Sequence, residues 1–369
     1  MEIRSVLNFY RGKTVLLTGH TGFKGSWLAI WLSSLGAKVV GLSDALPSEP
    51  CNFEVSGIGA LVDDRRVDVR DCYAVKQVVD EVQPDFVFHL AAQALVRHSY
   101  ANPVDTFSVN GMGTAHVLES LRSLNKPVVA VMITSDKAYD NVEWVWGYRE
   151  TDRIGGKDPY SGSKGVAELI IRSYFSSFFA SEDCNVRLGI ARAGNVIGGG
   201  DWASDRIVPD CMRAWSRGEK VEIRSPRATR PWQHVLEPLS GYLSLGIELA
   251  RNADKHGEAY NFGPPANQNH TVGELINGMS KHWKNVSWVD TSSQQHLHEA
   301  GLLKLNCDKA FVDLKWLPTL HFEETVRFTV EWYKAHYEQE LGSMLKFSIS
   351  QIKEYSALAA GRGMAWAQA

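Results

Sequence analysis

The sequence predicts an α/β protein with a doubly wound parallel sheet and a smaller C-terminal α/β lobe. Three observations lead to this fold class. Short apolar runs alternate with amphipathic helical segments through the first part of the chain. A glycine-rich turn, TGHTGFKG at 18–25, follows the first apolar run and precedes a helical segment. Beyond residue 192 the alternation loosens, and glycine and proline separate shorter elements.

The elements of the sheet follow in order along the chain. Each expected strand is a short apolar run that is continuous rather than alternating, as in a strand buried on both faces. These runs lie at 14–18, 38–41, 66–69, 85–90, 128–133 and 185–191. Helical spacing of apolar residues predicts helices at 26–35, 103–123 and 160–179. In the C-terminal lobe, Thr271 and Glu274 have the spacing of a capping box, and 322–337 is amphipathic. The tail from Ser343 is expected to be partly helical or loose.

Composition excludes several classes of protein. The 39 lysines and arginines are balanced by 42 aspartates and glutamates, and a net charge of −3 argues against a nucleic-acid-binding protein. The five cysteines are widely spaced and form no CxxC pair, so the sequence predicts neither a disulfide framework nor a metal site. The N-terminal residues lack the pattern of a signal peptide, and no apolar run approaches the ~20 residues of a membrane span. We therefore expect a cytoplasmic protein.

The glycine-rich turn predicts a dinucleotide site. Gly19, Gly22 and Gly25 let the backbone approach a pyrophosphate, and the following helix offers free N–H groups and the positive end of its dipole. The alternative, a bare glycine turn, is disfavoured by the strand and helix on either side. Asp44 can accept hydrogen bonds from the adenosine ribose, which favours NAD over NADP, or it simply occupies a turn. Asp68 either accepts from an adenine amino group or caps the helix before Cys72.

A second motif predicts proton transfer. Tyr160 and Lys164 form Y-x-x-x-K at the start of a helix, so both side chains emerge on one face about one turn apart. An ammonium group near a phenol lowers the pKa of the phenol, which makes tyrosine a usable general base. The alternative is a solvated lysine beside a packed tyrosine. The distance from the glycine-rich turn and the preceding strand favour the catalytic interpretation.

With TGHTGFKG, HLAAQ at 89–93, TSDK at 134–137 and YSGSK at 160–164, the chain resembles the extended short-chain dehydrogenase/reductase family over nearly its whole length. That family binds NAD(P) on a Rossmann-type sheet. The resemblance implies that Ser135 hydrogen-bonds the substrate oxygen on which Tyr160 acts. Sugar-nucleotide 4,6-dehydratases of the family follow this hydroxyl residue with Asp-Glu, whereas this chain has Asp136 and Lys137.

In this departure, with EWVWGYRE at 143–150 and ARAGNVIGGGDW at 191–202, the chain resembles the members of the family that act on CDP-glucose, and this resemblance implies a role in deoxysugar biosynthesis of the lipopolysaccharide type. The implied reaction oxidises C4, removes water across C5 and C6, and returns the hydride to C6. Asp136, if protonated, would donate to the departing hydroxyl. Lys137 would remove the C5 proton if neutral, or otherwise stabilise the enolate. The alternatives are a dTDP-, UDP- or GDP-linked sugar, an epimerase or reductase, and a non-catalytic NAD-binding scaffold.

The resemblance also assigns residues to ligands, with no metal. Residues 1–192, rejoined by about 231–258, are expected to bind NAD, and 193–369 mainly the sugar nucleotide. The expected cofactor contacts are Gly19, Thr21, Gly22, Phe23, Lys24, Gly25, Asp44, Asp68, Val69, Leu90, Ala91, Ala92, Tyr160 and Lys164. The expected substrate contacts are Gln93, Asn195, Arg206, Arg230 and Trp232. Trp144 and Trp146 either close over the sugar or pack as anchors. The helices at 103–123 and 160–179 are expected to form a homodimer, or part of a homotetramer.

Overall fold

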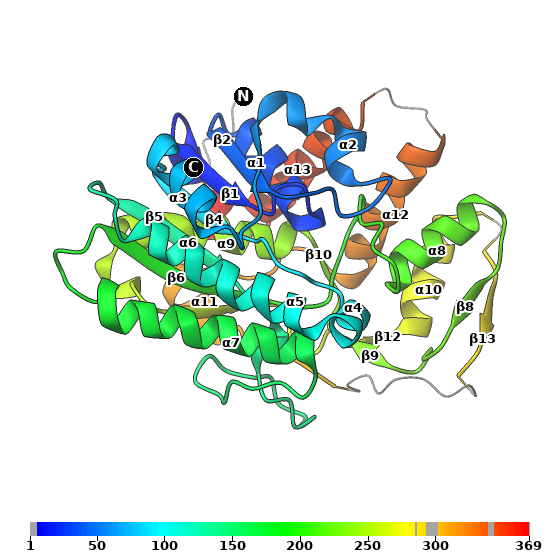
Figure 1. Cartoon of the computed structure of the whole chain (residues 1–369). Coiled ribbons are helices and arrows are strands. Elements are labelled where there is room, and N and C mark those ends of the chain that lie inside the picture. The colour runs from blue at the N-terminus through cyan, green and yellow to red at the C-terminus, as the bar shows by residue number, and fades with distance from the viewer. Residues whose placement is uncertain (1–5, 285, 293–301, 339–342, 369) are drawn as a thin grey trace.

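The computed structural model describes residues 6–284, 286–292, 302–338 and 343–368, and a parallel sheet of seven strands forms its centre (Figure 1). The strand order is β11-β6-β5-β4-β1-β2-β3, and every pairing is parallel. The strands are β1 (Thr14–Thr18), β2 (Lys38–Ser43), β3 (Asp63–Arg66), β4 (Phe86–His89), β5 (Val128–Ile133), β6 (Val186–Ala193) and β11 (Ala259–Phe262). The order reverses between β1 and β4, and ligands of doubly wound sheets bind at the carboxyl ends of the strands at this point.

The third strand and the seventh differ from the prediction. β3 covers Asp63–Arg66 instead of 66–69, because it is an edge strand that pairs only with β2 and needs no continuous apolar run. The apolar residue that suggested a strand, Val69, lies after β3 and packs instead against Gly113. The sequence analysis assigned no strand to Ala259–Phe262, yet β11 completes the sheet beside β6.

Two layers of helices cover the sheet. One face is covered by α3 (Cys72–Val82), α6 (Gly113–Leu121) and α7 (Pro159–Tyr174), whose apolar side chains form one core cluster with the strands. The predicted helix 103–123 is α5 (Pro103–Phe107), a π-helical turn at Ser108–Met112 and α6. The predicted helix 160–179 is α7 followed by a π-helical turn at Phe175–Phe179. The opposite face packs against α1 (Phe23–Ser34) and α9 (Leu236–Arg251).

The second lobe lies beside the carboxyl ends of the strands, at the right of Figure 1. Its helices are α8 (Ile207–Ser216), α10 (Val272–Ser280) and α12 (Phe322–Glu338), and its short strands are β7 (Val196–Ile197), β8 (Val221–Ile223), β9 (Thr229–Arg230), β10 (Gln233–His234), β12 (His270–Thr271) and β13 (Trp288–Asp290). The predicted capping box is present, since Thr271 Oγ1 accepts from the Glu274 N–H and the Glu274 carboxylate accepts from the Thr271 N–H. The remaining helices are α2 (Asn52–Ser56), α4 (Val96–Ala101) and α11 (Asp308–Leu314).

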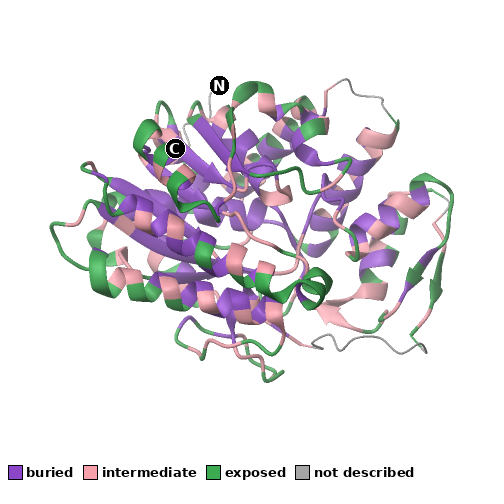
Figure 2. Cartoon of the chain, viewed as in Figure 1, coloured by how far each residue is buried: buried purple, intermediate pink, exposed green. Residues whose placement is uncertain are grey.

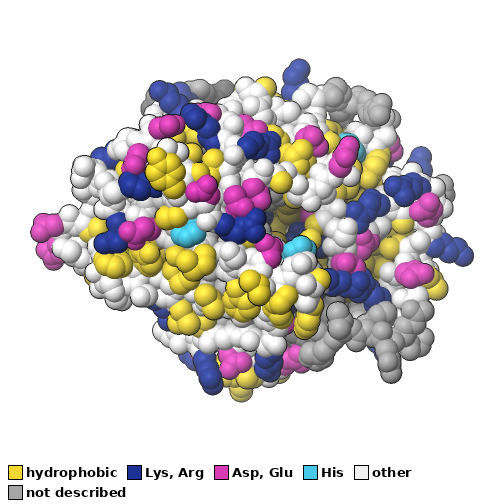
Figure 3. All heavy atoms as spheres, viewed as in Figure 1, with side chains coloured by type: hydrophobic (Ala, Val, Ile, Leu, Met, Phe, Trp, Pro, Cys, Tyr) yellow, Lys and Arg dark blue, Asp and Glu magenta, His cyan; other side chains and the backbone are white. Residues whose placement is uncertain are grey.

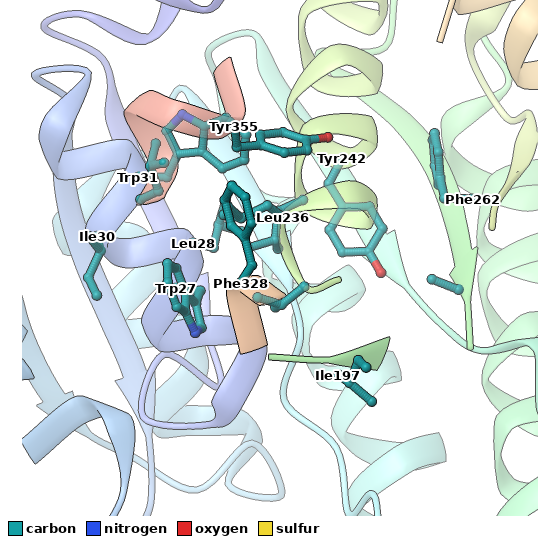
Figure 4. Close-up of a cluster of buried hydrophobic side chains, with 14 of the residues drawn as sticks. Trp27, Leu28, Ile30, Trp31, Ile197, Leu236, Tyr242, Phe262, Phe328 and Tyr355 are labelled. Carbon is teal, nitrogen blue, oxygen red and sulfur yellow. The ribbon is translucent and has the colours of Figure 1, made fainter. Parts of the chain in front are cut away.

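The C-terminal tail is an integral part of the core. Its helix α13 (Met344–Gly361) packs against α1, where Trp31 contacts Tyr355 and Trp366 edge to face. Figure 4 shows Trp31 and Tyr355 beside Leu236 of α9 and Phe328 of α12. Burial follows the same layers, with the strands and the inner helix faces buried (Figure 2). No helix in the described ranges is both long and apolar enough to span a membrane.

Candidate functional site

The glycine-rich turn between β1 and α1 packs so closely against neighbouring backbone that Gly19 and Gly25 cannot carry a side chain. Gly19 has a φ of +73°, and a Cβ there would lie 2.7 Å from the Ala91 backbone nitrogen. A Cβ on Gly25 would lie 2.0 Å from the Gly19 carbonyl oxygen. Gly22 is the N-cap of α1 and provides no side-chain cap, so the first N–H groups of the helix face the turn. A turn that tolerates no side chain, at an uncapped helix N-terminus, fits the pyrophosphate of a dinucleotide.

Acidic side chains follow β2 and β3, where an adenosine would lie. Asp44 comes directly after β2 and is exposed, and the loop behind it is fixed by Thr21, whose hydroxyl donates to the Ala45 carbonyl at 2.7 Å. Asp68 is held by Arg70, whose Nε donates to Oδ2 at 2.8 Å and lowers the pKa of the carboxyl. The cap of α3 is Asp71 and not Asp68. Arg70 is thus a further charged group beside the acidic side chains that follow β2 and β3, and the sequence did not predict it.

The segment after β5 brings a hydroxyl and a carboxyl together. Ser135 Oγ donates to Asp136 Oδ1 at 2.9 Å and accepts from the Lys137 N–H at 3.2 Å. Asp136 is 3% exposed and lies against the backbone at Gly194, where a Cβ would come within 2.0 Å of Oδ2. Gly194 is therefore required for the carboxyl to occupy this place. Within the described residues, the Lys137 ammonium group makes no hydrogen bond or ion pair.

Tyr160 and Lys164 lie in the first turns of α7. Asp158 caps this helix by accepting from the Ser161 N–H at 2.9 Å, which fixes where the motif begins. Burial raises the pKa of Tyr160 to about 12, while the Ser135 hydroxyl and the charge of Arg206 act to lower it and the charge of Asp136 acts to raise it. The sequence analysis had assigned this lowering to Lys164. Burial and the charge of Lys24 bring the pKa of Lys164 itself down to about 8.

Lys24 and Arg206 complete a charged cluster around these groups. Burial lowers the pKa of Lys24 to about 8, with the charge of Arg206 acting in the same direction and that of Asp136 against it. Arg206 donates from Nη1 to Asp201 Oδ2 at 2.7 Å, which raises the pKa of the guanidinium group. The sequence analysis placed Lys24 at the cofactor and Arg206 at the substrate. The structure brings them together, because the charges of Arg206 and Asp136 both act on the Lys24 ammonium group.

The other expected ligand contacts are arranged differently. Asn195 follows β6 with a φ of +48°, and the Arg230 guanidinium donates to the Thr229 carbonyl at 2.8 Å. Gln93 donates to Thr106 Oγ1 at 2.8 Å, and the Trp232 indole donates to the His270 carbonyl at 3.2 Å. Gln93 and Trp232 thus hold protein segments in place.

The remaining expected cofactor contacts surround the glycine-rich turn or follow β4. Phe23 begins α1, Val69 is buried, and residues 90–92 are half-buried after β4. His89 is a packed strand residue, as expected, and hydrogen-bonds to Thr18 at 2.8 Å.

The two tryptophans after the catalytic segment differ in exposure. Trp146 is 69% exposed, whereas Trp144 is half-buried against Tyr148, with ring centroids 5.2 Å apart. Trp144 therefore packs as an anchor for this segment. Within the described ranges, no group of three or more His, Cys, Asp or Glu side chains is arranged to hold a metal ion.

Comparisons with known proteins identify the family to which the chain is similar. Residues 16–329 match the model of the family described as GDP-mannose 4,6 dehydratase. A CDP-glucose 4,6-dehydratase from Salmonella typhimurium is 46% identical over 352 residues, which cover 94% of this chain and 97% of that protein. A dTDP-glucose 4,6-dehydratase from Streptomyces antibioticus is 27% identical over 279 residues, covering 73% and 75%. Among solved structures, epimerase Mth375 from Methanothermobacter thermautotrophicus has a TM-score of 0.76 at 25% identity, covering 91% and 96%.

Proposed function

We propose that this chain, which belongs to the GDP-mannose 4,6 dehydratase family of extended short-chain dehydrogenases/reductases, is a hydro-lyase that converts CDP-glucose to CDP-4-keto-6-deoxyglucose. One observation carries the proposal. A carboxyl that can act as an acid, Asp136, accepts a hydrogen bond from Ser135, and the same Ser135 lowers the pKa of Tyr160, the candidate base. An epimerase needs no such acid. The identity to the Salmonella typhimurium enzyme supports the choice of CDP-glucose.

NAD is the cofactor that fits the glycine-rich turn. Gly19, Gly22 and Gly25 would hold its pyrophosphate, and the exposed carboxylate of Asp44 would accept from its ribose hydroxyls. When bound, NAD would supply hydride transfer, accepting the hydride of C4 and returning it to C6. The overall reaction is therefore redox-neutral and releases only water.

The phenol of Tyr160 would take the proton of the C4 hydroxyl. Burial raises its pKa to about 12, so the base needs neighbouring groups that stabilise the phenolate. Ser135 and the charge of Arg206 already act to lower its pKa, and Lys164 lies one turn along the same helix face. Lys164 would also hold the nicotinamide ribose.

Asp136 would protonate the hydroxyl that leaves C6. Its position against Gly194 removes it from bulk water, and an acid in that position can deliver a proton to a leaving group without competition from solvent. The ketone formed at C4 acidifies the proton at C5. Lys137, whose side-chain nitrogen makes no ion pair within the described residues, would remove that proton as a neutral amine, or as an ammonium group would stabilise the enolate that forms.

The diphosphate and nucleotide would lie toward the second lobe. Arg206 and Arg230 are the candidate phosphate contacts, since a guanidinium group can donate two parallel hydrogen bonds to phosphate oxygens. Asn195, in its left-handed backbone conformation after β6, would donate to the same group. Gln93 and Trp232 would shape the pocket through the segments that they hold in place. In this division, 1–192 with 231–258 binds NAD and 193–369 mainly the sugar nucleotide.

A homodimer in the cytoplasm is the proposed assembly. Hydrophobic side chains gather over α5 and α7 on the face shown in Figure 3. Val104 is 80% exposed, and Met112 and Leu169 are 50% and 59% exposed. A surface of this kind on two adjacent helices fits a second copy of the same chain related by a twofold axis. A tetramer would need a further surface.

The deciding experiment incubates the purified protein and NAD with CDP-glucose, UDP-glucose, dTDP-glucose and GDP-mannose in parallel. Loss of one water is followed by mass spectrometry, and the 4-keto-6-deoxy product by its absorbance in alkali. We expect dehydration of CDP-glucose alone. Dehydration of another nucleotide sugar would keep the reaction and change the specificity. Absence of water loss from all four would reject the proposal in favour of an epimerase, a reductase or a binding protein.

A further inference from the structure

A buried ion pair lies behind the catalytic segments. Arg192 of β6 donates from Nε to Glu168 Oε1 at 2.7 Å and from Nη2 to Oε2 at 2.9 Å. Neither side chain has any exposed surface. Removing two charges from water often costs as much free energy as their attraction returns, so such a pair contributes little net stability. Its position therefore calls for an explanation other than stability.

The carboxylate of Glu168 connects the two catalytic segments. Thr134 Oγ1 donates to Glu168 Oε1 at 2.6 Å, and Thr134 immediately precedes Ser135. Glu168 lies one turn after Lys164 on α7, and Lys164 lies one turn after Tyr160, so the three share one face of the helix. One side chain thus fixes the end of β5 against the helix that carries the base.

The same carboxylate provides the negative charge near Lys164. Lys164 faces Lys24 from α1 and the buried, neutral His89 from β4, and Glu168 is the acidic group beside it. Burial and Lys24 lower the pKa of Lys164 to about 8, and the charge of Glu168 raises it. Without that charge, the ammonium group would lose its proton closer to neutral pH.

Arg192 extends the connection to the segment after the catalytic residues. Its Nη1 donates to Tyr139 Oη at 2.6 Å and to the Glu150 carbonyl at 3.2 Å. Tyr139 in turn donates to Asn261 Oδ1 at 2.8 Å, at the end of the sheet. The guanidinium group therefore holds the Glu168 carboxylate in one orientation through both of its oxygens.

We propose that Glu168 is a positioning residue with two separable effects. Through Thr134 it holds Ser135 at a fixed place relative to Tyr160. Through its charge it keeps Lys164 protonated at neutral pH. The inference rests on the proposed roles of these groups in dehydration and in NAD binding.

Two variants separate the effects. Glu168→Gln keeps the shape of the side chain and removes its charge. NADH affinity and the kcat for dehydration should both decline at alkaline pH. In this variant, we expect each decline to occur at a pH about one unit lower than in the wild type. Thr134→Val removes one hydrogen bond and leaves every charge in place. For this variant we expect kcat to fall several-fold with little change in KM, and both alkaline limbs to stay where they are.

Two matched controls test whether removing any buried polar group, rather than these two in particular, changes activity and NADH binding. Thr329→Val removes a buried hydroxyl that donates to the Thr325 carbonyl in α12, and Glu237→Gln removes a buried carboxylate in α9. Both should leave kcat per folded molecule and the alkaline limb of NADH binding unchanged. If the protein dehydrates no sugar nucleotide, the proposed function is rejected, but this inference is not. The pH dependence of NADH binding still tests it, because that measurement needs no turnover.

Two outcomes overturn the inference. One is a folded Glu168→Gln variant whose alkaline limb of NADH binding matches that of the wild type. The other is a Thr134→Val variant with wild-type kcat, and this measurement decides where Glu168→Gln fails to fold.

Discussion

The hydroxyl of Ser135 donates a hydrogen bond to Oδ1 of Asp136 at 2.9 Å. The group proposed to orient the substrate oxygen and the group proposed to act as acid are therefore directly coupled. When Asp136 carries its own proton, it no longer needs the one from Ser135, and the hydroxyl is free to turn toward the substrate. In the proposed mechanism, protonation of Asp136 and orientation of the C4 oxygen by Ser135 would therefore be linked through this one hydrogen bond.

Replacing Asp136 with asparagine should stop dehydration while leaving oxidation in place. Asparagine keeps the size of the side chain and an acceptor for Ser135, but it has no acidic proton for the leaving hydroxyl. We expect the rate of water loss from CDP-glucose, followed by mass spectrometry, to fall by a factor of at least ~10². Absorbance of reduced nicotinamide should still appear after substrate is added. A variant that dehydrates at the wild-type rate would remove Asp136 from the mechanism.

Replacing Tyr160 with phenylalanine tests the base. The variant lacks the oxygen that takes the C4 proton, so we expect kcat to fall by a factor of about 10²–10⁴ with NAD affinity retained. The matched control is Tyr10→Phe, because Tyr10 is also buried and its hydroxyl donates to the Leu243 carbonyl at 2.8 Å, inside the core. That control should lose about 1 kcal/mol of stability and keep its activity. Equal losses of activity in both variants would indicate damage to the fold.

The sequence predicts the central sheet well because its strands are buried on both faces. Strands β1, β4 and β5 are short, continuous apolar runs, a pattern typical of strands that are buried on both faces of a sheet. The edge strand β3 is charged, so its position depends on pairing with β2 and is not visible in the pattern. The helical tail could not be placed either, since its packing on Trp31 depends on residues more than 300 positions apart.

The site was predictable where spacing alone fixes geometry. Two residues four positions apart, such as Tyr160 and Lys164, lie on the same face of a helix. Three closely spaced glycines, at 19, 22 and 25, indicate a tight turn. The cluster of Lys24, Arg206 and Asp136 could not be predicted, because these residues come from three segments that meet only in the folded chain. The environment of Tyr160 also depends on folding, since burial outweighs the neighbouring groups that lower its pKa.

Replacing Leu169 with arginine tests the proposed dimer. Leu169 is 59% exposed on α7, and a charge there would be buried without a partner between two copies of the chain. We expect the mass measured by light scattering to fall to that of the monomer. Leu61→Arg is the matched control, because Leu61 is 55% exposed but lies at a distance in the fold, beside α2. The control should keep the wild-type mass, and a Leu169→Arg variant of unchanged mass would place the interface elsewhere.

Glu237 should make stability fall as pH rises. This glutamate is 1% exposed in α9, and its carboxylate accepts from the Thr319 N–H at 2.9 Å and from the Tyr355 hydroxyl at 2.8 Å. Burial raises its pKa from 4.5 to about 7, although these hydrogen bonds act to lower it. Between these two pH values the unfolded chain has lost the proton and the folded chain still holds it. The free energy of unfolding therefore falls as pH rises through this window, and is independent of this group below and above it.

The Glu237→Gln variant cannot titrate at this position, so its stability lacks this dependence. We expect the wild type to lose up to about 3 kcal/mol relative to the variant between pH 4.5 and 7, measured by urea denaturation at closely spaced pH values. The exposed Glu323 at the start of α12 provides the control, because Glu323→Gln should track the wild type across the same range. A wild-type curve that rises relative to Glu237→Gln would mean that the two backbone N–H groups stabilise the ionised carboxylate more than burial disfavours it.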